Sequence, residues 1–255
     1  RVTYETFPLT AENDFLPDLD AIPEETARRA KFIYINYPNN PTGAVATKAF
    51  YEKLVAWAKT YEVGVVSDLA YGALGYQGYE NPSFLSTPGA KDVGIEFYTF
   101  SKTFNMAGWR LAFAAGNGQM IEALNLIQDH LFVGIFPALQ EAGIAALLDS
   151  KSEEAVAQLN ATYDSRRDAF VQAAAKIGWQ AFPSKGSFYA WMPVPEGYTS
   201  ESFADLLLEK AHVAVAPGKG FGPAGDAYVR IGLLVEPERL VEAANRIANL
   251  QLFNN

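Results

Sequence analysis

The 255-residue sequence contains no cysteine and only two histidines, His130 and His212. The absence of cysteine excludes disulfide bonds, thiolate catalysis and a cysteine-ligated zinc site, and it is compatible with a reducing cytoplasm. Two histidines are too few for a histidine-rich metal site, and they disfavour a Ser-His-Asp triad. We therefore expect no bound metal.

The sequence also lacks long apolar runs and an excess of positive charge. No apolar stretch approaches the length of a membrane span, and residues 1–10 do not have the pattern of a signal peptide. The net charge of -9 argues against nucleic acid or an anionic membrane as a partner. With 49% hydrophobic and 19% charged residues, the composition is that of a folded globular protein. We expect a cytoplasmic protein of one large domain or up to two ordinary ones.

Apolar, strand-like runs alternate with amphipathic helical patterns over the first 150 residues. A buried strand is expected at residues 31–37, and further strands at 63–67, 93–99 and 111–115. The first helix carries Phe50, Leu54, Trp57 and Ala58 on one face, and two more helices are expected, one around residues 121–127 and the other over 138–148. This alternation is typical of an α/β domain with a mostly parallel sheet.

The pattern changes near residues 149–154, and the rest of the chain indicates a small α+β domain. Its expected elements are a helix at 153–177, a strand ending at 188–192, a helix at 202–211, strands at 213–217 and 228–234, and a last helix with Pro237 in its first turn. The predicted domains are therefore residues 1–150 and residues 151–255.

Polar residues follow the ends of predicted strands in four places. Because ligands of open α/β sheets bind at the carboxyl ends of strands, these residues could converge on one crevice. They are the run NYPNNPTG at 36–43, Asp68 with Tyr71, the group Thr99, Ser101 and Lys102 followed by Arg110, and Arg230 within YVRIG.

Each group also has a purely structural interpretation. Asn, Pro and Gly form turns, and Asp68 could cap a helix instead of holding a positively charged ring nitrogen. A lysine at a strand end is usually solvated, although two hydroxyls, Lys102 and Arg110 so grouped also suit a phosphate beside an amine nucleophile. Arg230 lies among apolar residues and needs a partner, and a carboxylate fits its planar fork best.

In order and content, these groups resemble the class I/II aminotransferases of pyridoxal-phosphate (PLP) fold type I. The resemblance covers nearly the whole chain and rests on NPTG at 40–43, DxxY at 68–71, Ser-Lys at 101–102, Arg110 eight residues after that lysine, and Arg230. Longer stretches, such as NYPNNPTGAVAT and SKTFNMAGWR, are similar to bacterial methionine-salvage transaminases and LL-diaminopimelate aminotransferases.

The resemblance implies PLP as the cofactor and an amino acid and a 2-oxo acid as substrates. Lys102 would carry the cofactor and move the substrate proton, with Asp68 facing the pyridine nitrogen. Tyr71 and Asn40 would donate hydrogen bonds to the phenolic oxygen of the ring. These implied roles make Lys102, Asp68 and Tyr71 the predicted catalytic residues.

The same resemblance assigns the phosphate and the substrate carboxylate to different arginines. Thr99, Ser101 and Arg110 would hold the phosphate, whereas Arg230, with Asn40, would bind the α-carboxylate in a two-point fork. The resemblance further implies a homodimer, and substrates such as methionine, glutamine, aromatic amino acids or diaminopimelate.

The family pattern begins before Arg1, so we expect the N-terminal part of the large domain to be missing. Residues 1–9 look like a strand that starts in the middle of a domain. The expected fold is thus fold type I with an incomplete, mostly parallel large domain and a small α+β C-terminal domain. A PLP-dependent C–S lyase or synthase on the same fold, and a non-catalytic truncated aminotransferase domain, remain alternatives.

Overall fold

The computed structural model describes residues 3–253 and divides the chain into two compact units. Unit 1 comprises Arg1–Pro17, Asn39–Ala44 and Asn160–Asn255, and unit 2 comprises Asp18–Pro38 and Val45–Leu159. The units are thus not continuous in sequence, because the NPTG segment packs with the C-terminal part of the chain. The predicted domain boundary near residue 150 stays a prediction.

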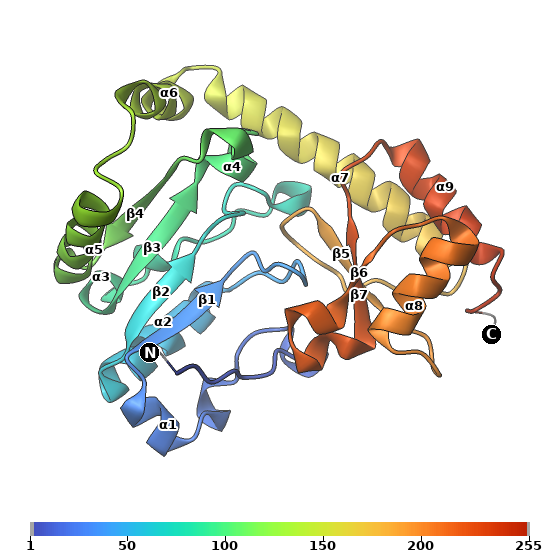
Figure 1. Ribbon diagram of the computed structural model, residues 1–255, viewed down its shortest axis with the longest axis horizontal. Coiled ribbons are helices and arrows are strands. Elements are labelled where there is room, and N and C mark those ends of the chain that lie inside the picture. Colours follow the sequence, from blue (N-terminus) through green and yellow to red (C-terminus); the bar gives the residue numbers. More distant parts are fainter. Residues whose placement is uncertain (1–2, 254–255) are drawn as a thin grey trace. The chain divides into compact units, whose positions relative to one another are not determined.

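Unit 2 is built on a four-stranded sheet whose order is β1-β2-β3-β4 (Figure 1). The first three strands run parallel, and the fourth is antiparallel to the third. All four expected strands are confirmed, with small shifts at their ends: β1 (Phe32–Asn36), β2 (Gly64–Asp68), β3 (Gly94–Thr99) and β4 (Ala112–Gly116).

Strand β1 is half-buried, and the expectation that it is buried throughout is wrong. Ile33 and Ile35 are buried at 5% and 3% exposure, whereas Phe32 and Tyr34 on the opposite face are 60% and 62% exposed. Successive side chains of a strand point to opposite faces, so one covered face buries only every second residue.

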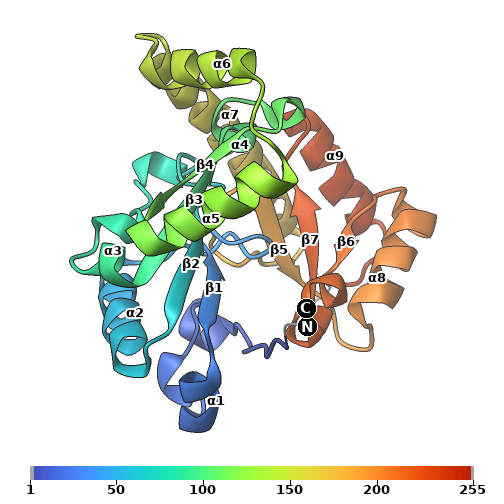
Figure 2. The same ribbon diagram turned by 60° about the vertical axis from the view of Figure 1, so that its left-hand side comes forward.

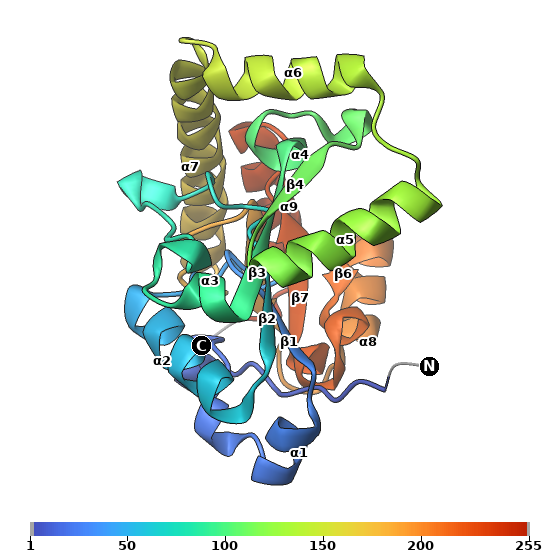
Figure 3. The ribbon, with the colours of Figure 1, turned by 90° about the vertical axis from the view of Figure 1, so that its left-hand side faces the viewer.

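Helices lie on both sides of this sheet, with α2 and α5 on opposite faces (Figures 2 and 3). Helix α2 begins where the Thr47 hydroxyl accepts a hydrogen bond from the amide of Phe50. It buries Phe50, Leu54 and Ala58 as its spacing predicts, whereas Trp57 of the predicted face is only half-buried. The helices of this part of the chain are α1 (Glu24–Arg29), α2 (Lys48–Tyr61), α3 (Ala90–Val93), α4 (Phe100–Thr103), α5 (Gly118–Leu131), α6 (Pro137–Leu148) and the first part of α7 (Ser152–Lys176).

Unit 1 contains the rest of α7 and an antiparallel sheet of order β5-β7-β6 (Figure 2). Its core includes Trp179, which packs edge-on against Phe170 and Phe203, and the buried face of the last helix with Leu240, Ala244 and Ile247. The further elements are β5 (Tyr189–Pro193), α8 (Ser200–Leu206), the π-helical turn η6 (Leu207–Ala211), β6 (Ala216–Pro217), β7 (Tyr228–Gly232) and α9 (Pro237–Ala248).

Two expected strands differ from the structure. Strand β6 has only two residues, because His212 turns the chain in the left-handed conformation (φ 55°) and the amide of Val213 closes that turn on the Leu207 carbonyl at 3.1 Å. Of the strand expected at residues 1–9, residues 3–9 form no strand and pair with neither sheet, and residues 1 and 2 lie outside the described part of the chain. Among the described residues, no helix is both long and apolar enough to cross a membrane.

Candidate active site

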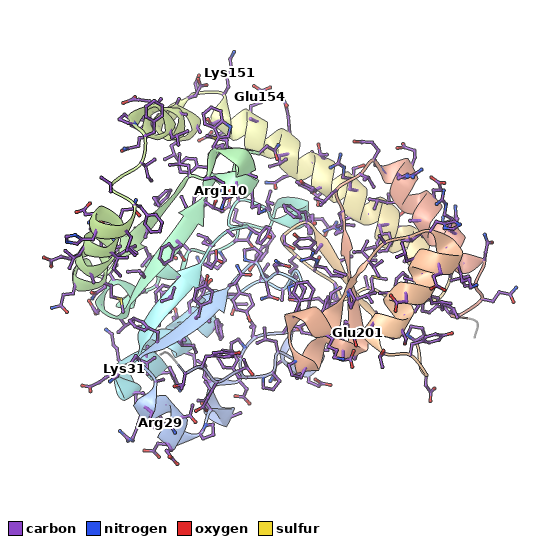
Figure 4. The ribbon with its side chains drawn as sticks, viewed as in Figure 1. Arg29, Lys31, Arg110, Lys151, Glu154 and Glu201 are labelled. Atoms are coloured by element: carbon purple, nitrogen blue, oxygen red, sulfur yellow. The ribbon has the colours of Figure 1, made fainter. Side chains whose placement is uncertain are left out.

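The predicted cofactor residues of unit 2 gather at one edge of its sheet. Asp68 is the last residue of β2 and Thr99 the last of β3, and these parallel strands end at the same edge. Lys102 lies in α4, the turn that follows β3, while Arg110 precedes the antiparallel strand β4 at the same edge (Figure 4). The topology therefore brings these side chains to the carboxyl ends of the strands, where open α/β sheets bind ligands.

The Asp68 carboxylate is held by a neighbouring tyrosine and by its own turn. Tyr34 donates its hydroxyl to Oδ2 at 3.1 Å, and the amide of Ala70 donates to Oδ1 at 3.2 Å. Burial, together with the negative charge of Asp68 and this hydrogen bond, raises the pKa of Tyr34 to about 12, so Tyr34 remains a donor at neutral pH. Each carboxylate oxygen has two lone pairs, and Asp68 can therefore still accept a hydrogen bond from a ligand.

The Lys102 side chain lies beside Tyr71. Its ammonium nitrogen is 5.9 Å from the centre of the Tyr71 ring, at the outer limit of a cation–π contact. Tyr71 is buried at 4% exposure, whereas Lys102 is half-buried. The short helix that carries the lysine is capped by Thr99, whose hydroxyl accepts a hydrogen bond from the Ser101 amide at 3.2 Å. Lysine and tyrosine are thus adjacent on a locally fixed backbone.

Two hydroxyls and a guanidinium lie next to this lysine in the chain. The Thr99 hydroxyl donates to the Ser101 hydroxyl at 3.0 Å, and the exposed Arg110 donates to the carbonyl of Ala107 at 2.9 Å. Arg110 has a left-handed backbone (φ 54°), which is uncommon for a residue with a side chain and is often found at functional sites. Hydroxyl and guanidinium donors are the groups that bind a phosphate.

The other face of the sheet carries a buried carboxylate, Glu96, which is not among the predicted site residues. Glu96 of β3 is 6% exposed and pairs in register with Ser67, the residue before Asp68. Its oxygens accept hydrogen bonds from the hydroxyls of Ser67 and Ser83 and from the amide of Phe84. Burial raises the pKa of Glu96, and these donors act in the opposite direction. The only signal in the sequence is a glutamate inside an apolar strand.

In unit 1, the NPTG segment holds Asn40 against Arg230. The Asn39 side chain accepts hydrogen bonds from the amide and hydroxyl of Thr42, at 3.2 and 2.8 Å, which closes the turn. Gly43 has φ +71°, and a Cβ there would lie 2.4 Å from Cβ of Ser184, so the turn requires glycine. Asn40 then accepts a hydrogen bond from the Arg230 guanidinium at 2.8 Å.

Two aromatic rings that the sequence did not indicate lie against Arg230. The guanidinium carbon is 4.1 Å from the ring centre of Tyr189 on β5 and 4.7 Å from that of Phe221, the last residue of the turn η7 (Gly218–Phe221). Both distances lie within the range of a cation–π contact.

A groove of about 910 Å³ lies elsewhere in unit 2, between the sheet and α5. Its lining is mainly apolar, with Phe32 and Val66 from the sheet and Met120 and Leu124 from the helix. None of the predicted site residues lines this groove, although Tyr34 reaches both the groove and Asp68. The predicted chemistry therefore lies outside this groove.

The predicted site residues are therefore divided between the two units. Asn40 and Arg230 meet in unit 1, and the single cleft expected for the whole set stays a prediction. Within residues 3–253 no three His, Asp or Glu side chains are grouped as a metal site. The remaining six predicted site residues lie in unit 2, and they are Asp68, Tyr71, Thr99, Ser101, Lys102 and Arg110.

Comparison with known proteins decides the family. Residues 1–247 match the family described as aminotransferase class I and II. The chain belongs to this family. The predicted resemblance is thereby confirmed.

Curated relatives give the same result at high identity. The chain is 57% identical over 253 residues to the L-glutamine–4-(methylsulfanyl)-2-oxobutanoate aminotransferase of Bacillus subtilis, covering 99% of this chain and 63% of that protein. It is 50% identical over 240 residues to the LL-diaminopimelate aminotransferase of Moorella thermoacetica, covering 94% and 61%. The chain thus spans about three fifths of the length of these relatives.

Solved structures share the fold. Substrate-bound BacF from Bacillus subtilis superposes with a TM-score of 0.91 at 46% identity, over 97% of this chain and 63% of that chain. An aminotransferase from Staphylococcus aureus gives 0.91 at 40% identity, over 97% and 66%. The prediction of PLP fold type I is confirmed by this likeness and by the mixed sheet of unit 2.

Proposed function

We propose that the protein is a PLP-dependent aminotransferase that moves an amino group between an amino acid and a 2-oxo acid. The observation that carries this proposal is the set of groups at the sheet edge of unit 2, namely an amine, a carboxylate and phosphate-type donors. Family membership supports the reaction class.

The residues present fit the chemistry of PLP. Asp68 keeps unused lone pairs for a protonated ring nitrogen, and the Lys102 amine lies over the ring of Tyr71, which carries a hydroxyl. Thr99, Ser101 and Arg110 supply two hydroxyls and a positive charge for the phosphate. When bound, PLP supplies an electron sink for the carbanion of the substrate.

Each side chain has a proposed task. Lys102 binds the cofactor and moves the proton at the substrate Cα, and Asp68 holds the proton at the ring nitrogen. Tyr71 and Asn40 would each supply a hydrogen-bond donor for the phenolic oxygen of the ring. The guanidinium of Arg230, steadied by Asn40, binds the substrate carboxylate with paired N–H donors and so orients the Cα–H bond.

The proposed substrate class follows from the names of the relatives. One is named for L-glutamine and 4-(methylsulfanyl)-2-oxobutanoate, and others are named for LL-diaminopimelate. We therefore propose an amino donor of the methionine, glutamine or diaminopimelate type. A cytoplasmic location is part of the proposal, supported only by a cysteine-free sequence that is compatible with a reducing compartment.

We also propose that the protein acts as a homodimer. Leu131, Phe132 and Phe136, in and after α5, are exposed by 66–69%, and such a cluster of large apolar side chains typically marks an interface. Light scattering of the full-length protein should give the mass of two chains. Phe132→Lys should favour the monomer, while Leu208→Lys, which replaces an apolar side chain of 53% exposure in unit 1, should not.

A donor panel tests the proposed reaction. The purified full-length protein should show the visible yellow absorbance of bound PLP, and it should consume an amino acid only when a 2-oxo acid is supplied. Consumption without a 2-oxo acid would favour a C–S lyase or synthase. A colourless protein that takes up no added PLP would contradict the proposal and favour a non-catalytic domain.

A further inference from the structure

We propose that Tyr189 and Phe221 are positioning residues that fix the plane of the Arg230 guanidinium for carboxylate binding. This inference rests on the proposed function of Arg230 and extends it to two residues that carry no motif. The structural observation is the pair of rings whose centres lie 4.1 and 4.7 Å from the guanidinium carbon.

Strand register explains why the rings meet this arginine. Arg230 on β7 pairs with Trp191 on β5 and with the small Ala216 on β6. Tyr189 lies two residues before Trp191, on the same face of the strand, so its ring reaches Arg230 diagonally. After Ala216 in the chain, the turn η7 places Phe221 against Arg230. The Phe221 ring also packs edge-on against Trp191, with 6.0 Å between the ring centres.

Aromatic contacts leave the edges of the guanidinium as its binding surface. The N–H donors of arginine lie in the plane of the guanidinium, whereas aromatic rings stack on its faces. Of the five N–H donors, the described residues engage one, in the hydrogen bond from Arg230 to Asn40 at 2.8 Å. A carboxylate must therefore approach in the plane, where two parallel hydrogen bonds can form. The rings thus provide orientation without taking donors from the ligand.

The exposure of these residues agrees with a binding position. Arg230 and Tyr189 are half-buried, and Phe221 is 42% exposed. A ligand that reaches the guanidinium therefore finds an apolar ring beside it, which excludes water from one side of the ion pair. Removal of the ring should loosen the guanidinium and admit water, so carboxylate affinity should fall while PLP affinity does not.

The experiment uses the full-length protein with 4-(methylsulfanyl)-2-oxobutanoate as the carboxylate probe. Titration calorimetry on the PLP-free protein gives the dissociation constant without turnover. We expect Phe221→Leu and Tyr189→Leu each to raise it about three- to tenfold, the range of a partly desolvated cation–π contact. Tenfold corresponds to about 1.4 kcal/mol. In turnover with the loaded enzyme, KM should rise by a similar factor and kcat should change less.

Conservative variants separate positioning from mere packing. Tyr189→Phe and Phe221→Tyr keep a ring face, so both should bind the probe within about twofold of the wild type. Tyr198→Leu is the matched control, since it removes a ring of 38% exposure in unit 1 whose ring contact is with Phe203. A ring-free variant of either position that binds the probe like the wild type would overturn the inference.

A double variant distinguishes this inference from the proposed function. A lysine at position 230 keeps the charge but has no plane to fix, so Phe221→Leu should weaken binding less than twofold further in an Arg230→Lys background. If Arg230→Lys alone leaves probe binding unchanged, the proposed role of Arg230 fails. If Arg230→Lys weakens binding about tenfold and Phe221→Leu adds its full effect to it, only the positioning role fails.

Discussion

Replacing Tyr34 by phenylalanine removes the one side-chain donor described for the Asp68 carboxylate. A hydrogen bond to a charged group contributes about 1.5–3 kcal/mol. At 3.1 Å this bond is long for a hydrogen bond between two oxygens, and Tyr34 is 62% exposed. Water therefore replaces much of the lost interaction. We therefore expect a loss of about 0.5–1 kcal/mol, which weakens PLP binding roughly two- to fivefold.

Titration of the PLP-free full-length protein, followed by visible absorbance, measures this effect. Because the pKa of Tyr34 is raised to about 12, its hydroxyl keeps its proton, and the ratio of the variant to the wild type should be constant from about pH 6 to 9. Tyr79→Phe is the matched control, since it also removes a tyrosine hydroxyl of unit 2, but one that donates to the Ala46 carbonyl, at 3.5 Å. Unchanged PLP affinity in Tyr34→Phe would refute the idea that this bond orients Asp68.

Four further variants test the site and its surroundings. Lys102→Ala should abolish the visible absorbance of PLP and slow turnover at least ~100-fold, the low end for a positioned acid–base group, whereas His130→Ala should leave turnover unchanged. Arg110→Lys should lose PLP faster on dialysis while 2-oxo acid binding changes less, because a lysine cannot form the planar fork. Burial raises the pKa of Glu96 in the folded state, so folding favours its protonated form, and this contribution to stability is present at low pH and is lost as the pH rises through the folded pKa. Glu96→Gln should therefore gain stability relative to the wild type in thermal unfolding as the pH rises above the ordinary carboxyl range, and a difference independent of pH would contradict this.

The sequence predicts the elements of unit 2 well because each depends on local pattern. The spacing of Phe50, Leu54 and Ala58 predicts a helix face that the structure buries. Apolar runs likewise predict β2 and β3, and the polar residues after them fall at the carboxyl edge of the sheet. Where a motif follows a strand end, chain order alone is sufficient to place it.

Contacts between distant segments are not encoded in such patterns. Phe221 and Tyr189 meet Arg230 through strand register, and no local feature of either marks that contact. The burial of Glu96 depends on Ser67 and Ser83, which come from other parts of the chain. Periodicity also cannot tell whether one or both faces of β1 are covered, which is why the exposure of Phe32 was not predicted.

Glu96 also makes an irregular segment behave as part of the core. The amide of Phe84, in the short turn η4 (Phe84–Ser86), donates to the buried carboxylate at 2.8 Å, and Phe84 itself is fully buried. This amide should exchange with deuterated solvent as slowly as the amides of β3, although it lies outside any strand or long helix. Fast exchange at Phe84 would mean that the segment opens independently of the sheet. Slow exchange would place the loop and the central strands in one cooperative unfolding unit, joined by a single carboxylate.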